Sequence, residues 1–306
     1  MYFLNKEERM YLNKGLIPES REMYIDRELR GWNWQQPPLK PVYNFTLAVY
    51  EVASSYCPTA RDLYLRKVMG VKQKTNKYMI QGIILHNTLK EFITICKKRF
   101  YNNSVDKLKM KLIDIKQEKI EELLNSGNYN IEDEQKEELK KKIRLLWNFE
   151  KQRVIYRIQE ILSRQPYIEI DALLFQALPV VVEHKLNGSF LGLSSHLSTD
   201  AINFSESIVV DIKFGKPREF HKLSVTGYAL TMEAIHSFPV NIGCVVYPSF
   251  KENRILLDRD FFIINDELRQ KFIENRDERM RMIYQEDDPG KQEDCNQMCP
   301  FFKKCH

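Results

Sequence analysis

The sequence lacks features that would place it in several other classes of protein. No apolar run approaches the roughly 18–20 residues that a membrane-spanning helix needs. There is no internal repeat and no low-complexity linker. The opening stretch, MYFLNKEERMYLNKG, has charges at its sixth to ninth positions instead of the apolar core of a signal peptide. These absences exclude helical membrane proteins and repeat proteins, and we expect a cytoplasmic chain.

A strong excess of charge of one sign is also missing. The chain has 47 Lys and Arg against 42 Asp and Glu, a formal net charge of +5. This balance permits nucleic acid as a partner without predicting it. Apolar residues make up 43% and charged residues 29% of the chain, so a packed core is expected. The 306 residues are enough for one large domain or two modest ones.

The first half of the chain reads as helical. Residues 41–70 predict helix with a break near Cys57 and Pro58, and residues 79–100 predict an amphipathic helix from apolar residues at 3.6-residue spacing. Residues 105–163 carry dense Lys and Glu with Leu and Ile at helical intervals. The turn at 125–130 divides this segment into an αα-hairpin.

The second half has short β-branched segments that predict a sheet. These segments are residues 167–175, 179–186, 198–202, 207–214, 241–249 and 253–265, with helices expected at 219–236 and 266–285. The fold class is therefore α/β, of α+β organisation, with a mixed central β-sheet. We expect three parts: an N-terminal helical lobe (1–165) that includes the insertion 105–163, a core sheet with a flanking helix (166–265), and a C-terminal helix with a cysteine tail (266–306) that packs back on the lobe.

Two charges interrupt an apolar strand in SIVVDIKFGKP, residues 207–217. Burying Asp211 and Lys213 on one strand face is costly unless they are paired or bind a metal. Asp200 ends the preceding strand, and a short hairpin through NFSES would bring it beside Asp211. Two carboxylates can hold Mg²⁺ or Mn²⁺, with the carbonyl of Ile212 as a further ligand. Lys213 could then stabilise charge on an attacked phosphate or orient the attacking water.

Simpler interpretations of these residues stay open. Asp211 and Lys213 could form an ordinary ion pair on a half-exposed strand. Asp171 and Glu183 form a rival set, or Glu183 adds a third acid to the first site. His86 is a candidate metal ligand if its helix packs near Asp200, and is otherwise a core or boundary histidine.

Three of the six cysteines lie close together near the C-terminus. Cys295, Cys299 and Cys305 are separated by three and five residues, and a fourth ligand is needed to close a tetrahedral metal or cluster site. Cys57 is the best candidate because it precedes a proline at a helix break. His306 could replace one thiolate in a zinc site. The remaining two cysteines are expected to be buried thiols: Cys96 and Cys244.

In this order (a Cys, a helical His, an Asp, an Asp-x-Lys strand and three late Cys) the chain resembles the iron–sulfur RecB-like exonucleases of CRISPR adaptation, of the archaeal type I-A variety. The resemblance covers about residue 45 to residue 305. It implies a RecB-like PD-(D/E)XK nuclease core, a [4Fe–4S] cluster and a Mn²⁺ or Mg²⁺ centre. It also implies a metal-dependent DNA exonuclease that trims DNA ends before spacer integration.

The resemblance assigns roles by position. The cluster ligands would be Cys57, Cys295, Cys299 and Cys305, and the catalytic metal ligands His86, Asp200, Asp211 and the carbonyl of Ile212. Lys213 would be the catalytic lysine, and Glu183 stays in the catalytic set as the third acid. Related nucleases often carry a Gln shortly before a helical Tyr; here Lys222 or Ser224 precedes Tyr228. We predict that Lys222 and Tyr228 contact DNA.

The implied partners are DNA, as single-stranded ends or overhangs, together with a CRISPR integrase and other adaptation proteins. No membrane partner is expected, and a homo-oligomer is compatible with the sequence. Two other functions remain as alternatives. One is a non-catalytic DNA-binding or scaffolding subunit of the spacer-acquisition complex, and the other is a zinc-stapled structural protein.

Overall fold

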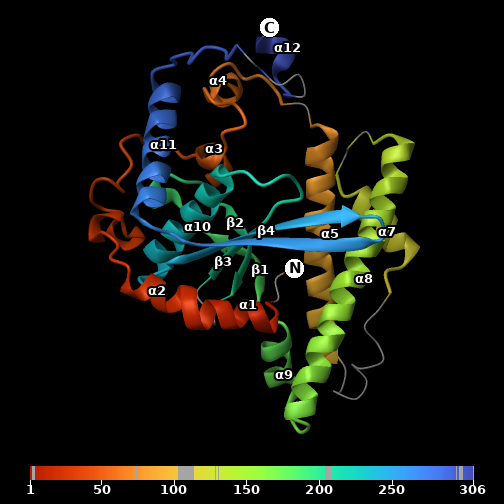
Figure 1. The fold of residues 1–306 in the computed structure, drawn as a ribbon. Coiled ribbons are helices and arrows are strands. Elements are labelled where there is room, and N and C mark those ends of the chain that lie inside the picture. The colour runs from red at the N-terminus through yellow and green to blue at the C-terminus, as the bar shows by residue number, and fades with distance from the viewer. Residues whose placement is uncertain are drawn as a thin grey trace.

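The computed structural model describes these residues: 1, 4–73, 75–102, 114–127, 129, 131–203, 208–293, 295 and 299–305. A five-stranded mixed sheet runs through the middle of the molecule, and helices cover both of its faces (Figure 1). The chain is therefore a mixed α/β protein of α+β organisation, as the sequence predicts.

The helical part of the chain comes first. Its α-helices are α1 (Lys6–Tyr11), α2 (Ile17–Glu22), α3 (Val49–Ala53), α4 (Arg61–Lys67), α5 (Lys77–Asn102), α7 (Gln117–Leu124), α8 (Asp133–Arg164) and α9 (Ile170–Ala177). Short helical turns join them: η1 (Leu12–Leu16), η2 (Arg27–Leu29) and η3 (Gly31–Asn33). The predicted break lies between α3 and α4, and α7 packs against α8 as the expected αα-hairpin.

The sheet follows, with α10 (Phe220–His236) inserted between its third and fourth strands. Its strands are β1 (Val181–Leu186), β2 (Leu197–Asn203), β3 (Ile208–Ile212), β4 (Ile242–Lys251) and β5 (Arg254–Ile263), and η4 (Ser189–Leu191) lies between the first two. They are arranged in sequence order; β3 and β4 are parallel and all other neighbours are antiparallel. The chain ends with α11 (Asp266–Tyr284) and α12 (Phe302–Cys305).

Every residue of β3 is buried, because helices cover the sheet on both sides. Val210 and Ile212 face the core formed with α5 and α8. Val209 faces the opposite core, which α3, α10 and α11 complete. Successive strand residues point to opposite faces, so Asp211 and Lys213 share the α10 face with Val209. The two charges therefore lie on a strand that is covered on both sides.

One predicted strand is wrong. Residues 167–175 do not join the sheet; Ile170–Ala177 form α9, which packs against α5 and α8. Its buried residues Leu173, Leu174 and Ala177 follow a helical spacing, and Asp171 lies in its first turn, where a carboxylate favours a helix. A short apolar run does not distinguish a buried helix from a strand, and packing against the helical lobe decided in favour of helix.

Buried arginines of α11 attach the C-terminal helix to the N-terminal segment. Glu233 of α10 accepts hydrogen bonds from Arg30 at 2.8 Å and from Arg269 at 2.7 and 2.9 Å. Arg279 donates to the backbone carbonyls of Glu51 and Ser54. Segments more than 200 residues apart in sequence are thus joined by bonds to buried charges.

Several predictions fall on residues outside the described part of the chain. These are residues 204–207 of the NFSES turn, residues 105–113 of the insertion, and His306. Within the described residues, none of the helices combines the length and the apolar character required to cross a bilayer.

Candidate active site

The hairpin of β2 and β3 brings the two predicted carboxylates together. Ala201 pairs with Val210, and the same antiparallel register one residue further sets Asp200 opposite Asp211. The backbone N–H of Ile212 donates a 2.8 Å hydrogen bond to Oδ2 of Asp200. This bond holds the Asp200 carboxylate over the end of β3, as the sequence predicts from the spacing of the two strands.

Asp211 is buried, with 4% of its surface exposed, and forms an ion pair with Lys213, whose Nζ lies 2.9 Å from Oδ2. The pKa of Asp211 is raised to about 6, chiefly by burial; Lys213 lowers the pKa and the charge of Asp200 raises it, but burial prevails. Burial alone would lower the pKa of Lys213, but the charges of Asp211 and Asp200 outweigh burial and raise it. Lys213 is therefore a protonated ammonium held beside two carboxylates.

His86 reaches the same carboxylates from a different element. It lies on α5, and its Nδ1 is 3.5 Å from Oδ1 of Asp200. Its ring packs edge-on against Phe214, with centroids 5.2 Å apart. The condition for His86 as a candidate ligand, that α5 packs near Asp200, is thus met by the fold.

Glu183 lies next to this group on β1. The β1–β2 register pairs Val182 with Ala201, which places Glu183 across from Asp200. Its backbone is left-handed, with φ of 49°, an uncommon conformation for a residue other than glycine. Its carboxylate forms a 2.8 Å ion pair with Lys90 of α5. Glu183 therefore lies in line with Asp200 and Asp211 across the strands, but its carboxylate pairs with Lys90 and not with Lys213.

The rival pair, Asp171 and Glu183, does not lie on two neighbouring strands. Asp171 is exposed in the first turn of α9, whereas Glu183 is on β1. The prediction that placed both on strands fails with the strand at 167–175.

The two predicted DNA contacts on α10 have different surroundings. Burial, followed by the charges of Asp211 and Asp200, raises the pKa of the Tyr228 hydroxyl. Lys222 forms ion pairs with Asp260 at 3.2 Å and Glu219 at 3.7 Å, so its charge is already balanced. Both residues stay predicted DNA contacts.

Sequence reasoning missed a buried histidine in the first turn of α10. Nδ1 of His221 lies 3.1 Å from the hydroxyl of Tyr247 on β4. Burial, and then the charge of Lys213, lowers the pKa of His221 to about 4, so its ring is neutral at neutral pH. The available signal was a histidine eight residues after the Asp-x-Lys lysine, at the start of the next helix.

The donor set suits a hard divalent cation. Asp200 and Asp211 offer carboxylate oxygens, Ile212 a backbone carbonyl, and His86 a ring nitrogen, which Mn²⁺ and Mg²⁺ accept. Oδ2 of Asp211 is fully buried and accepts no regular hydrogen bond from a described residue, although it lies in the ion pair with Lys213. Among the described residues, no three His, Cys, Asp or Glu side chains converge tightly enough to form a ready-made ion site.

The cysteines predicted to act together lie at one end of the molecule, where α4, the end of α11 and α12 meet (Figure 1). Cys299 and Cys305 pack beside Leu63 of α4 and Phe301. Burial raises the pKa of the Cys299 thiol, and the charges of Cys57 and Cys305 add to the rise. All four thiols are free, so the donor chemistry fits a thiolate-bound metal or cluster. Cys96 and Cys244 are buried elsewhere, as predicted.

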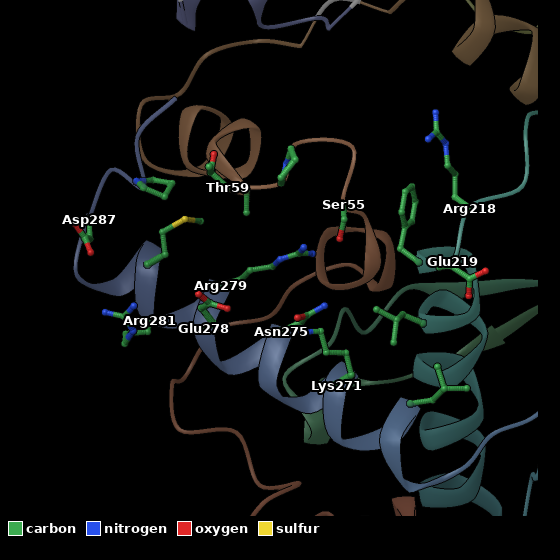
Figure 2. A pocket seen from close by; sticks show the side chains of 17 residues that line it. Ser55, Thr59, Arg218, Glu219, Lys271, Asn275, Glu278, Arg279, Arg281 and Asp287 are labelled. Atoms are coloured by element: carbon green, nitrogen blue, oxygen red, sulfur yellow. The ribbon is translucent and has the colours of Figure 1, made fainter. Parts of the chain in front are cut away.

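A groove of about 850 Å³ lies between the loop after α3, the start of α10 and α11 (Figure 2). Arg218, Lys271 and Arg281 line it together with acids that include Glu219 and Glu278. In the described part of the chain, neither Arg218 nor Lys271 forms an ion pair. The groove therefore carries mixed charge, with free basic groups along its edge.

An aromatic row runs from this groove to His221 and Tyr247. Phe220 lines the groove and packs edge-on against Tyr56, with ring centroids 4.8 Å apart. Phe220 also packs against His221, whose pKa responds to Lys213. Tyr56 does not line the groove itself, but its ring is 70% exposed beside Phe220. Aromatic faces beside basic groups are the usual surface for single-stranded nucleic acid.

Comparison with known proteins gives a consistent result. The profile of the family "CRISPR-associated exonuclease Csa1" matches residues 1–306. The chain is 29% identical to the CRISPR-associated exonuclease Csa1 of Saccharolobus solfataricus over 308 residues, 99% of each chain. It is 27% identical to the protein of the same name from Thermoproteus tenax over 281 residues, 92% of this chain and 91% of that one. No solved structure matches significantly.

Proposed function

Because the chain belongs to the CRISPR-associated exonuclease Csa1 family, we propose that it is a metal-dependent DNA exonuclease that trims DNA ends before spacer integration. The observation that carries this proposal is the register that sets Asp200 opposite Asp211, with Lys213 and His86 within 3.5 Å of these carboxylates. Four groups of complementary chemistry from three elements meet at one point of the fold.

Each group has a role in phosphodiester hydrolysis. A bound Mn²⁺ or Mg²⁺ would supply Lewis-acid activation of the phosphate and of the attacking water. Asp200, Asp211, His86 and the carbonyl of Ile212 would hold it. The ammonium of Lys213 stays protonated and can stabilise the charge that grows on the attacked phosphate. The Ile212 N–H fixes one oxygen of Asp200 and leaves the other toward His86.

Two neighbours complete the proposed site. Neutral His221 and the hydroxyl of Tyr247 form a buried pair beside Lys213 and can keep its side chain directed at the carboxylates. The Glu183 carboxylate, across from Asp200, would be the third acid of the site when it is released from Lys90.

We propose the groove beside the site as the path of a single DNA strand. Tyr56 and Phe220 would stack on bases, and Arg218 and Lys271 would contact phosphates. A strand in this groove would pass Phe220 and reach Lys213, so its end could be presented to the carboxylates. An integrase and other adaptation proteins would be the partners that receive the trimmed DNA.

We also propose a thiolate-bound [4Fe–4S] cluster on Cys57, Cys295, Cys299 and Cys305. Its role would be structural, because it would join a loop of the helical lobe to the C-terminal tail across 238 residues. The measurement is iron, sulfide and zinc per chain in protein purified without oxygen. If the protein is colourless and contains stoichiometric zinc, the cluster proposal is refuted in favour of a zinc site.

The nuclease proposal is tested with labelled single-stranded and duplex DNA in the presence of Mn²⁺. We expect end-dependent shortening by the wild-type protein and its loss in Asp211→Asn. Asp171→Ala is the matched control, because Asp171 is an exposed acid outside the site. DNA binding without turnover in the wild-type protein would refute the enzyme and favour a scaffolding subunit. Equal cleavage by Asp211→Asn would refute the assigned site.

A further inference from the structure

Two loops from opposite ends of the sequence are fastened together beside the thiols. Arg61, the first residue of α4, donates from Nε and Nη2 to the two carboxylate oxygens of Asp288, each at 2.8 Å. Such a two-pronged contact between a guanidinium and a carboxylate fixes orientation as well as distance. The partners are 227 residues apart, so this contact sets tertiary structure.

The same two loops share further bonds that lead to Cys57. Thr59 donates from its hydroxyl to the carbonyl of Gly290 at 3.0 Å, and the N–H of Gly290 donates to Asp288 at 3.0 Å. Gly290 has φ of +77°, a left-handed conformation that favours glycine in this turn. The Thr59 hydroxyl also lies 3.6 Å from the sulfur of Cys57. Thr59, Arg61, Asp288 and Gly290 are called the clasp below.

The clasp connects the isolated cysteine to the segment that carries the other three. Cys57 is two residues before Thr59, and Cys295 is five residues after Gly290. The carbonyl of Cys57 accepts a hydrogen bond from Ala60, which begins the turn into α4. The bonds of the clasp use side-chain oxygens, backbone groups and a guanidinium, and none of them requires a metal. The position of Cys57 is thus determined by the protein alone.

We propose that Arg61 and Asp288 are positioning residues for the thiolate centre: they fix the Cys57 loop against the tail, so that the isolated ligand Cys57 is in place before metal binds. This inference rests on the proposed thiolate centre. Ligands that are held in place before binding lower the ordering cost of the bound state, which is the general advantage of preorganisation. Because Thr59 and Ala60 also line the groove, the clasp fixes that wall too.

The test compares metal retention in Arg61→Ala, Arg61→Lys and Asp288→Ala with the wild-type protein. After anaerobic reconstitution, iron and sulfide per chain are measured, together with the rate of iron release to a chelator. We expect release to be roughly 10–100-fold faster in Arg61→Ala, the range for loss of an outer-shell partner. Arg61→Lys should be intermediate, because an ammonium keeps the charge but not the two-pronged geometry.

The matched control is Arg164→Ala, which removes an exposed ion pair with Glu160 on α8, away from the cysteines. We expect wild-type release from this variant. The melting temperature of each metal-free protein separates positioning from folding: the clasp variants should stay folded while losing metal faster. A folded Arg61→Ala that retains iron as well as the wild-type protein overturns the clasp inference alone. A wild-type protein that takes up neither iron nor zinc overturns the thiolate centre itself.

Discussion

Asp211→Asn should abolish nuclease activity and, in metal-free protein at neutral pH, increase stability. The side chain keeps its shape but loses the charge that burial penalises. Asp211 is almost fully buried, and burial raises its pKa from 3.8 to about 6. The folded protein therefore favours the protonated acid, and an ionised Asp211 opposes folding. If Asp211 is a metal ligand, as proposed, this cost to stability is the expected conflict between function and stability.

The magnitude follows from the pKa. A rise of about two pKa units corresponds to about 3 kcal/mol between the protonated and ionised forms. Between about pH 4 and pH 6 the folded protein binds more protons than the unfolded chain, so the free energy of unfolding falls as pH rises. The stability that comes from binding a proton at Asp211 is fully present below pH 3.8 and is lost above pH 6. The variant should thus gain less than about 1 kcal/mol at pH 4 and about 3 kcal/mol at pH 8.

The assay is urea unfolding of both proteins with a chelator present, at several pH values from 4 to 8. Other titrating groups are common to both proteins and cancel in the difference, apart from Lys213 and Asp200, which are coupled to Asp211. Added Mn²⁺ should then stabilise the wild-type protein and have little effect on the variant, because only a folded ligand set binds it.

A difference in stability that does not change with pH would refute this reasoning. It would mean that Asp211 does not titrate near pH 6 and that Lys213 compensates its burial in full. A variant that Mn²⁺ stabilises as strongly as the wild-type protein would remove Asp211 from the ligand set.

Three other substitutions test neighbouring parts of the structure. Lys213→Met should keep the Mn²⁺-dependent rise in melting temperature but lower the cleavage rate about 100-fold or more, since the ammonium acts on the phosphate; an unchanged rate at saturating Mn²⁺ would contradict this role. His86→Ala should raise the Mn²⁺ concentration needed for cleavage roughly tenfold or more, measured by metal titration; an unchanged requirement would remove His86 from the site. Glu233→Gln should lower the free energy of unfolding by about 3–5 kcal/mol, because Arg30 and Arg269 lose their buried partner; a loss below about 1 kcal/mol in urea unfolding would show that water screens these charges.

The groove lies between the loop after Cys57 and the start of α10. Loop residues after Cys57 form one wall of the groove, and Phe220, next to His221, forms another. A change in the loop would therefore alter the shape of the proposed DNA path without touching Asp200 or Asp211. This arrangement gives the clasp a structural consequence for substrate binding as well as for metal retention.

The sequence by itself determined the strands around the carboxylates. Alternation along β2 and β3 and the short connection between them permit few registers, and one of them sets Asp200 opposite Asp211. Long segments with apolar residues at helical spacing also predicted helices correctly, as in α5 and α8. The region at 167–175 failed because a short apolar run fits either helix or strand, and its partners lie far away in the chain.

Only the tertiary structure decided which distant residues meet. His221 contacts Tyr247, Glu183 pairs with Lys90, and Arg61 pairs with Asp288. Local propensity extends over one turn or one strand pair, so no sequence spacing predicts such contacts. They depend on how helices pack on the two faces of the sheet, which burial of the whole apolar core determines. The sequence therefore named the candidate groups, and packing decided how each is oriented and held.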